Sequence, residues 1–86
     1  MGGAVVARQT QHVVQPFVAG KGGVLRAERA VACKTSEEAV RRARNMAASK
    51  LGVVAFTMSG DAETGDYDER PTVLFKAGQV PPEFEE

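Results

Sequence analysis

The sequence predicts a single α+β domain with the order strand, strand, helix, strand, strand. Two segments rich in β-branched and aromatic residues precede a well-marked helix start, and two more follow the helix. Glycine-rich or acidic turns separate these segments. The simplest packing of this ββαββ order is a four-stranded, mainly antiparallel sheet with one helix packed on one face. We place the domain at residues 11–79 and expect residues 1–10 and 80–86 to be flexible ends.

The first two strands are predicted on either side of a glycine-rich turn. Residues 12–19 form the first strand, and Gly20-Lys21-Gly22-Gly23 closes it. Pro16 cannot donate a hydrogen bond to a ladder, which favours an edge strand or a bulge there. Residues 24–34 alternate between apolar and polar side chains, although Arg29 falls on the apolar parity, and we expect a hairpin partner with one solvated face. The turn lacks the spacing, the Ser or Thr and the helix of a phosphate-binding P-loop.

The helix is predicted to begin at a capping box. In Thr35-Ser36-Glu37-Glu38 the threonine can accept a hydrogen bond from the amide three residues on, and the last glutamate can reach back. Both acids favour the positive end of the helix dipole. Apolar residues then recur at helical spacing as far as Leu51, and Gly52 stands where a left-handed C-cap belongs. Most of the apolar face is alanine, which lets a helix lie close on a sheet.

Residues 53–58 and 72–77 are the two remaining predicted strands. The loop between them, from Asp61 to Glu69, carries five carboxylates, which are ligands of the kind that Ca²⁺ or Mg²⁺ requires. Its spacing is not that of an EF-hand, because the sixth position is Asp66 rather than Gly and the twelfth is Thr72 rather than Glu. We therefore predict a solvated hairpin loop and no metal site.

The predicted core is thin. Thirteen Ala and twelve Val make up most of the hydrophobic residues, whereas Ile and Trp are absent. Burying Ala stabilises a fold much less than the ~1.5–3 kcal/mol of a buried Val, Leu or Phe, so marginal stability or help from a partner chain is expected. Our first hypothesis is a non-catalytic protein-interaction module. It would bury its open sheet face or an edge strand against itself, as a homodimer, or against another protein.

The net charge of zero hides a split along the chain. Residues 1–50 carry a net charge of +6 and residues 51–86 carry −6. The total argues against a protein that coats nucleic acid indiscriminately. The alternative function is a nucleic-acid-binding accessory protein that uses five arginines of the second strand and the helix, namely Arg26, Arg29, Arg41, Arg42 and Arg44. Pairing of Glu37 with Arg41 and of Glu38 with Arg42 is a structural explanation of part of the same pattern.

His12 and Cys33 are the only side chains whose usual chemistry could supply a nucleophile and a base. Cys33 ends an apolar-patterned strand and is expected to be a small core residue, whereas His12 opens a strand and is expected at the surface. We therefore predict no enzyme, no catalytic residue and no cofactor. One Cys allows no internal disulfide, which favours a reducing cytoplasm. We expect no membrane span and no signal peptide, because neither pattern is present.

Three segments resemble a group of short bacterial proteins of unknown function. They are Val31-Ala32-Cys33-Lys34-Thr35-Ser36-Glu37-Glu38-Ala39, Gly52-Val53-Val54-Ala55-Phe56, and the run from Ser59-Gly60-Asp61 to Thr64-Gly65-Asp66-Tyr67. The resemblance covers roughly residues 12 to 82. It implies a bacterial cytoplasmic protein of this size and carries no activity.

Overall fold

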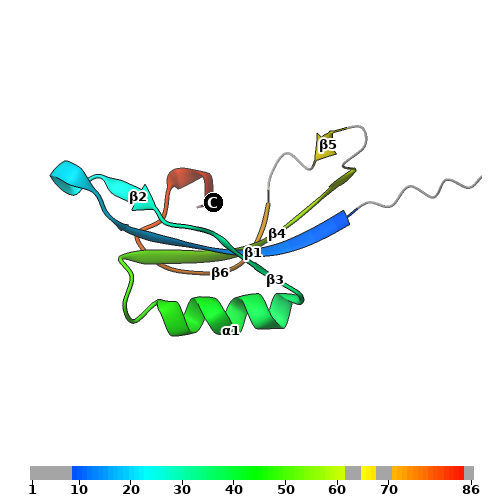
Figure 1. Ribbon diagram of the computed structural model, residues 1–86, viewed down its shortest axis with the longest axis horizontal. Helices are drawn as coiled ribbons and strands as arrows, with labels where there is room; N and C mark the ends of the chain where they lie inside the picture. The colour runs from blue at the N-terminus through cyan, green and yellow to red at the C-terminus, as the bar shows by residue number, and fades with distance from the viewer. Residues whose placement is uncertain (1–8, 62–64, 68–70, 85–86) are drawn as a thin grey trace, which may run out of the picture.

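The computed structural model describes residues 9–61, 65–67 and 71–84. Within them, six strands form one sheet and a single α-helix packs against one of its faces (Figure 1). The strands are β1 (Gln9–Ala19), β2 (Leu25–Ala27), β3 (Val31–Cys33), β4 (Gly52–Asp61), β5 (Asp66–Tyr67) and β6 (Thr72–Gly78). The helix is α1 (Ser36–Met46), and two short 3-10 turns are η1 (Lys21–Gly23) and η2 (Pro82–Phe84).

Every strand pair in the sheet is antiparallel. β1 and β4 pair with each other along nearly their whole length and form the centre. β2 and β3 both pair with the outer edge of β1, while β6 and β5 pair with β4. α1 connects β3 to β4 and lies below the sheet in the view of Figure 1. The predicted α+β class, with one helix on one face of an antiparallel sheet, is confirmed.

The predicted count of four strands is wrong for two reasons, and the first lies at Pro16. The second predicted strand is divided into β2 and β3, because residues 28–30 oppose only Gln15 and Pro16 of β1. Pro16 has no N–H to offer, and its carbonyl accepts from the Glu28 amide at 2.9 Å. The predicted bulge is thus confirmed, but the predicted edge strand is not, because β1 has partners on both sides.

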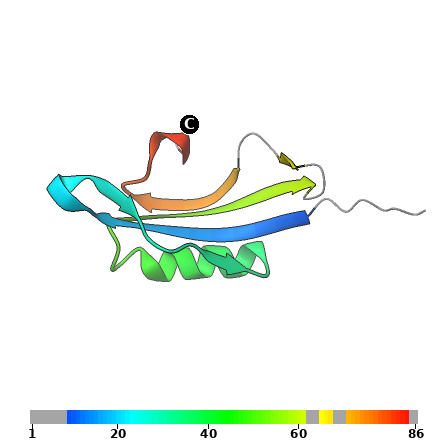
Figure 2. The ribbon, with the colours of Figure 1, turned by 45° about the horizontal axis from the view of Figure 1, so that its top comes forward.

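The second reason is β5, a two-residue strand that pairs with the far end of β4. It belongs to the acidic loop, of which residues 62–64 and 68–70 lie outside the described part of the chain. β5 is a strand of the sheet itself, beside the end of β4, and it lies away from α1 in both views (Figures 1 and 2). This segment of the acidic loop is therefore not beside the basic helix.

The C-terminal segment, for which we predicted a flexible end at residues 80–86, carries two side chains that pack on the sheet. Val80 and Phe84 are buried, and η2 folds back over the face opposite α1 (Figure 2). The ring centroid of Phe84 lies 5.3 Å from that of Phe56 and 6.4 Å from that of Phe17. The two prolines prevent a longer helix but permit one 3-10 turn, which is enough to bring the ring onto the sheet. Residues 85–86 and 1–8 lie outside the described part, and β1 begins at Gln9.

Two small cores lie on the two faces of the sheet. The helix side holds Val14, Ala39, Ala43, Val53 and Ala55, and the opposite side holds Phe17, Val54, Val80 and Phe84. The largest fully buried side chains are only valines. The thin core expected from the composition is present.

The helix begins as predicted and ends earlier. The Thr35 hydroxyl accepts from the Glu38 amide at 3.0 Å, so this half of the predicted capping box is confirmed, whereas the Glu38 carboxylate accepts from the Lys34 amide rather than from that of Thr35. The last helical residue is Met46 rather than Leu51. The amides of Ser49 and Lys50 both donate to the Met46 carbonyl at 3.0 Å, which closes the last turn. The Leu51 amide then donates to the Phe17 carbonyl, so the chain is tied to β1 before β4 begins.

Glu38 joins the helix cap to an ion pair. Its Oε1 accepts from the Lys34 amide at 3.0 Å, and its Oε2 lies 3.1 Å from Arg42 Nε. The bond from the Lys34 amide, followed by the contacts with Arg42, lowers the pKa of the Glu38 carboxyl against the smaller opposing effect of burial. A lowered folded-state pKa stabilises the fold above the unfolded pKa, and this contribution is lost as the pH falls through the folded value.

Glu38→Gln is therefore expected to lower the melting temperature at pH 7 by a few degrees. The difference from the unmodified protein should shrink as the pH falls below the ordinary glutamate pKa of about 4.3 and disappear below the lowered pKa of the folded state, where the carboxyl is protonated. Thermal unfolding followed by circular dichroism between pH 2 and 7 measures it. Glu37→Gln removes the same charge from the same helical turn. Equal losses in the two variants would assign the effect to the helix dipole and not to these contacts.

Candidate interaction surface

An uncharged row of side chains crosses the sheet on the face opposite α1. Val13 of β1 pairs with Ala32 of β3 and with Phe56 of β4, and Phe56 pairs in turn with Val73 of β6. Directly opposed residues of antiparallel strands share a face. Phe56 packs with the core beneath η2, so the whole row lies on that face. Two residues further along, Gln11 pairs with Met58 on the same face.

These six residues form what we call the open-face patch: Gln11, Val13, Ala32, Phe56, Met58 and Val73. Gln11, Ala32 and Val73 are exposed, and the other three are half-buried. Val73 keeps 37% of its surface exposed, which is among the highest values for a large apolar side chain in the described residues. No member carries a charge, although 26% of the chain is charged. Depletion of charge is the compositional mark of the centre of a protein interface.

The patch has a border at each end of β4. Phe84 of η2 covers one side of Phe56, and β5 pairs with Gly60 and Asp61 beyond Met58. η2 lies over the face opposite α1 (Figure 2), whereas β5 extends the sheet beyond Met58. The chain thus covers part of the face opposite the helix with its own C-terminal segment and leaves the centre accessible.

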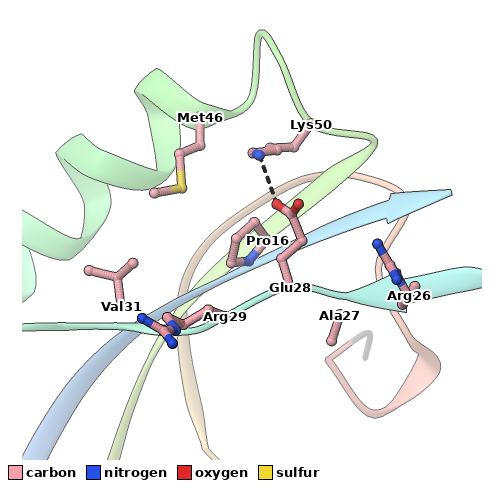
Figure 3. Close-up of a pocket in the computed structure, with 8 residues that line it drawn as sticks. All are labelled: Pro16, Arg26, Ala27, Glu28, Arg29, Val31, Met46 and Lys50. Carbon is pink, nitrogen blue, oxygen red and sulfur yellow. Dashed lines mark ion pairs between the residues drawn. The ribbon is translucent and has the colours of Figure 1, made fainter. Parts of the chain in front are cut away.

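The five arginines predicted as a basic face occupy more than one place. Arg26 and Arg29 line a pocket of about 430 Å³ at the break between β2 and β3 (Figure 3). Arg41 and Arg44 line another, of about 420 Å³, between α1 and β6. Arg42 is paired with Glu38. In the described part of the chain the five side chains therefore do not share one pocket.

Arg44 has an aromatic neighbour that the sequence did not indicate. Its guanidinium carbon lies 5.7 Å from the centroid of the Phe75 ring, which is cation–π range. Phe75 is half-buried and packs against the helix-side core, so the contact fixes Arg44 along the flank of α1. This position makes Arg44 a part of the helix–sheet contact as well as of the surface.

His12 and Cys33 are direct cross-strand partners in the β1–β3 ladder. Each nevertheless has a different polar neighbour. His12 Nδ1 lies 3.0 Å from the Thr57 hydroxyl, and the Cys33 thiol faces the Val31 carbonyl at 4.0 Å. Burial, and next the charge of Glu38, raises the pKa of the Cys33 thiol. A raised pKa leaves less thiolate at neutral pH, which is the opposite of what a nucleophilic cysteine needs.

Two features that we did not expect, a metal site and a membrane span, can be examined in the described residues only. Among the side chains that the structure describes, at residues 9–60, 65 and 71–84, no three His, Cys, Asp or Glu are placed to hold a metal ion. The helix found in these ranges is too short and too polar to cross a bilayer. The carboxylates of the acidic loop that fall at residues 62–64 and 68–70 lie outside them.

Comparisons of the chain with protein-family models, with curated proteins and with solved structures found no match. The resemblance to short bacterial proteins therefore stays a prediction.

Two features were missed by the sequence analysis. The open-face patch could not be predicted, because residues 53–58 are apolar on both faces of the strand. Such a pattern predicts a buried strand but does not indicate which face of the sheet remains exposed. Phe84 was missed because it follows two prolines in an acidic tail. A lone aromatic residue in such a tail was the available signal, since a large apolar side chain gains about 1.5–3 kcal/mol on burial.

Proposed function

We propose that this protein is a small non-catalytic interaction module that self-associates through the open-face patch. The observation that carries the proposal is the uncharged row from Ala32 to Val73 across the sheet, exposed at both ends. Sheets stack face to face about 10 Å apart through such rows. A second copy is therefore a natural cover for this face.

Charge favours a second copy over an acidic or basic partner. A two-fold axis places the patch against itself, so like charges within it would repel, and it carries none. The net charge of the whole chain is also zero, so two copies approach without overall repulsion. The largest fully buried side chains are valines, so additional apolar burial matters to this fold. A surface of six residues is small, and we expect a weak dimer with a dissociation constant in the micromolar range or above.

Val73→Lys tests the proposal, because it places a charge in the patch on an exposed side chain of an edge strand. We expect the dimer to weaken at least about tenfold, since a charge must be desolvated at the interface. Sedimentation velocity over a range of protein concentrations measures it. Val24→Lys is the matched control, because Val24 is 65% exposed and lies beside η1, away from the patch.

A chain that sediments as a monomer up to millimolar concentration would overturn self-association. Equal weakening by Val24→Lys and Val73→Lys would remove the patch from the interface. The alternative function, nucleic-acid binding through the five arginines, stays a prediction, as do the cytoplasmic location and the bacterial origin. Titration of DNA and RNA at low salt separates the two functions, because binding through arginines weakens steeply with added salt.

A further inference from the structure

The pocket at the break between β2 and β3 combines positive charge with an apolar floor. We call it the bulge pocket. Arg26 of β2 and Arg29 of the break lie at opposite ends of the pocket with Glu28 between them, and Lys50 approaches from the segment after α1 (Figure 3). Buried Pro16 lies between these elements. The pocket, of about 430 Å³, is a shallow depression open to solvent.

We propose that the bulge pocket binds an organic phosphate. Arg26 and Arg29 are exposed and point apart from opposite ends of the pocket (Figure 3), so both side chains turn inward to hold the phosphate with the planar fork of donors that Arg presents. The apolar body of the ligand lies on Met46 and Val31, which approach each other from α1 and β3 (Figure 3). The pocket holds three cationic side chains and one carboxylate, so an anion is the ligand that its charge favours.

The carboxylate of Glu28 is the group that opposes this binding. Its Oε1 lies 2.7 Å from Lys50 Nζ, and the two side chains keep 34% and 29% of their surface exposed. An ion pair this exposed contributes little to stability and opens readily. Glu28 therefore forms an ion pair with Lys50 when the pocket is empty, and it competes with the phosphate for the Lys50 ammonium group. Removing this carboxylate should improve binding.

The pocket is held in place by bonds to the backbone rather than by its charged groups. The Glu28 amide donates to the Pro16 carbonyl, and the Gln15 side-chain amide donates to the Glu28 carbonyl. On the opposite wall, the Lys50 amide donates to the Met46 carbonyl. Substituting the charged ends of Arg26, Glu28 or Arg29 leaves these bonds intact. The variants below are therefore expected to fold.

Adenosine monophosphate is the probe, titrated at low salt and followed by the amide NMR resonances of the pocket. We expect shifts at Ala27, Glu28 and Lys50. The double variant Arg26→Gln, Arg29→Gln should weaken binding at least about tenfold, because two charge-assisted hydrogen-bonding groups are lost. Glu28→Gln should tighten binding about threefold or more. A misfolded variant would not bind adenosine monophosphate more tightly, so this second result does not depend on how well the variants fold.

Matched controls carry the same charge changes outside the pocket. The double variant Arg41→Gln, Arg44→Gln removes two arginines from the other pocket, and Glu37→Gln removes one carboxylate from α1. Equal effects from these controls would mean that only overall charge is sensed and would overturn the proposal. So would the absence of shifts at the bulge pocket with adenosine monophosphate, or equal binding of adenosine, which lacks the phosphate.

A short oligothymidylate distinguishes two sources of the phosphate. Tighter binding than adenosine monophosphate, lost in the Arg26→Gln, Arg29→Gln variant, assigns the site to single-stranded nucleic acid. Equal or weaker binding assigns it to a free organic phosphate. The same double variant should not change sedimentation, because neither arginine belongs to the open-face patch. Failure of the phosphate site and failure of self-association are thus separate results.

Discussion

Gly52→Ala is expected to destabilise the protein by about 4 kcal/mol or more, the size reserved for core or backbone damage. Gly52 is the first residue of β4 and is buried. A Cβ atom there would overlap the backbone of Gln79, which crosses at this point. No side-chain rotation relieves a clash with backbone, so either β4 or the segment after β6 must move. A domain of this length has a total stability of roughly 4–13 kcal/mol, so the variant should be largely unfolded or close to it.

Urea denaturation followed by circular dichroism measures this loss. Gly22→Ala is the control, because its added Cβ meets nothing within 4 Å and only the positive φ of 73° opposes it. That strain is expected to cost about 1–2 kcal/mol. Equal losses for the two variants would show that the crossing of Gln79 over β4 is not tightly packed in solution.

Gly52 has a different structural role from the one that its place in the sequence predicts. Its position after a helical repeat predicted a C-cap, because a glycine there is common at helix ends. The helix instead ends at Met46, and the Leu51 amide bonds to β1. Gly52 is glycine because a distant segment passes over it. Local patterns carry no information on such a crossing, which links residues far apart in the chain.

The helix start and the bulge were predictable because their causes are local. Thr35 and Glu38 make a cap from residues three apart, and Pro16 disrupts a ladder because it lacks an N–H. The division of the second strand was not predicted, although Arg29 breaks the alternation among the residues, 28–30, that leave the ladder. That departure creates the bulge pocket. Its partner Lys50 comes from the other side of the helix, and only the fold brings it to Glu28.

The basic concentration in the first half of the chain was also visible in the sequence, but its distribution was not. Helical spacing places Arg42 and Arg44 about 200° apart around the axis. The fold turns Arg42 toward Glu38 and Arg44 toward Phe75. Arg26 of β2 and Arg29 of the break line one pocket together with Lys50. Charge counting therefore finds the cations but not the pockets, because pockets depend on which elements become neighbours.

The second large effect is expected from Phe84→Ala, which should lower the stability by about 3 kcal/mol. Phe84 keeps only 9% of its surface exposed and contacts both Phe17 and Phe56. Phe84 and Val80 are the two residues of the described C-terminal segment that belong to the second core. The Phe84 carbonyl also accepts from Lys76 Nζ at 3.4 Å, so η2 is tied to β6 by a polar contact as well. That contact survives the substitution, whereas the aromatic packing does not.

Phe84→Ala should also change self-association, because it uncovers Phe56, a member of the open-face patch. A larger apolar surface predicts a tighter dimer or aggregation, in contrast to the weaker dimer expected of Val73→Lys. Urea denaturation and sedimentation velocity measure the two effects. Glu83→Ala, in the same 3-10 turn and exposed, should change neither. A loss of stability below about 0.5 kcal/mol in Phe84→Ala, the range of ordinary surface substitutions, would show that η2 does not cover the sheet in solution. The accessible face would then extend from Met58 to Phe17, and the interface would be larger than the six residues of the patch.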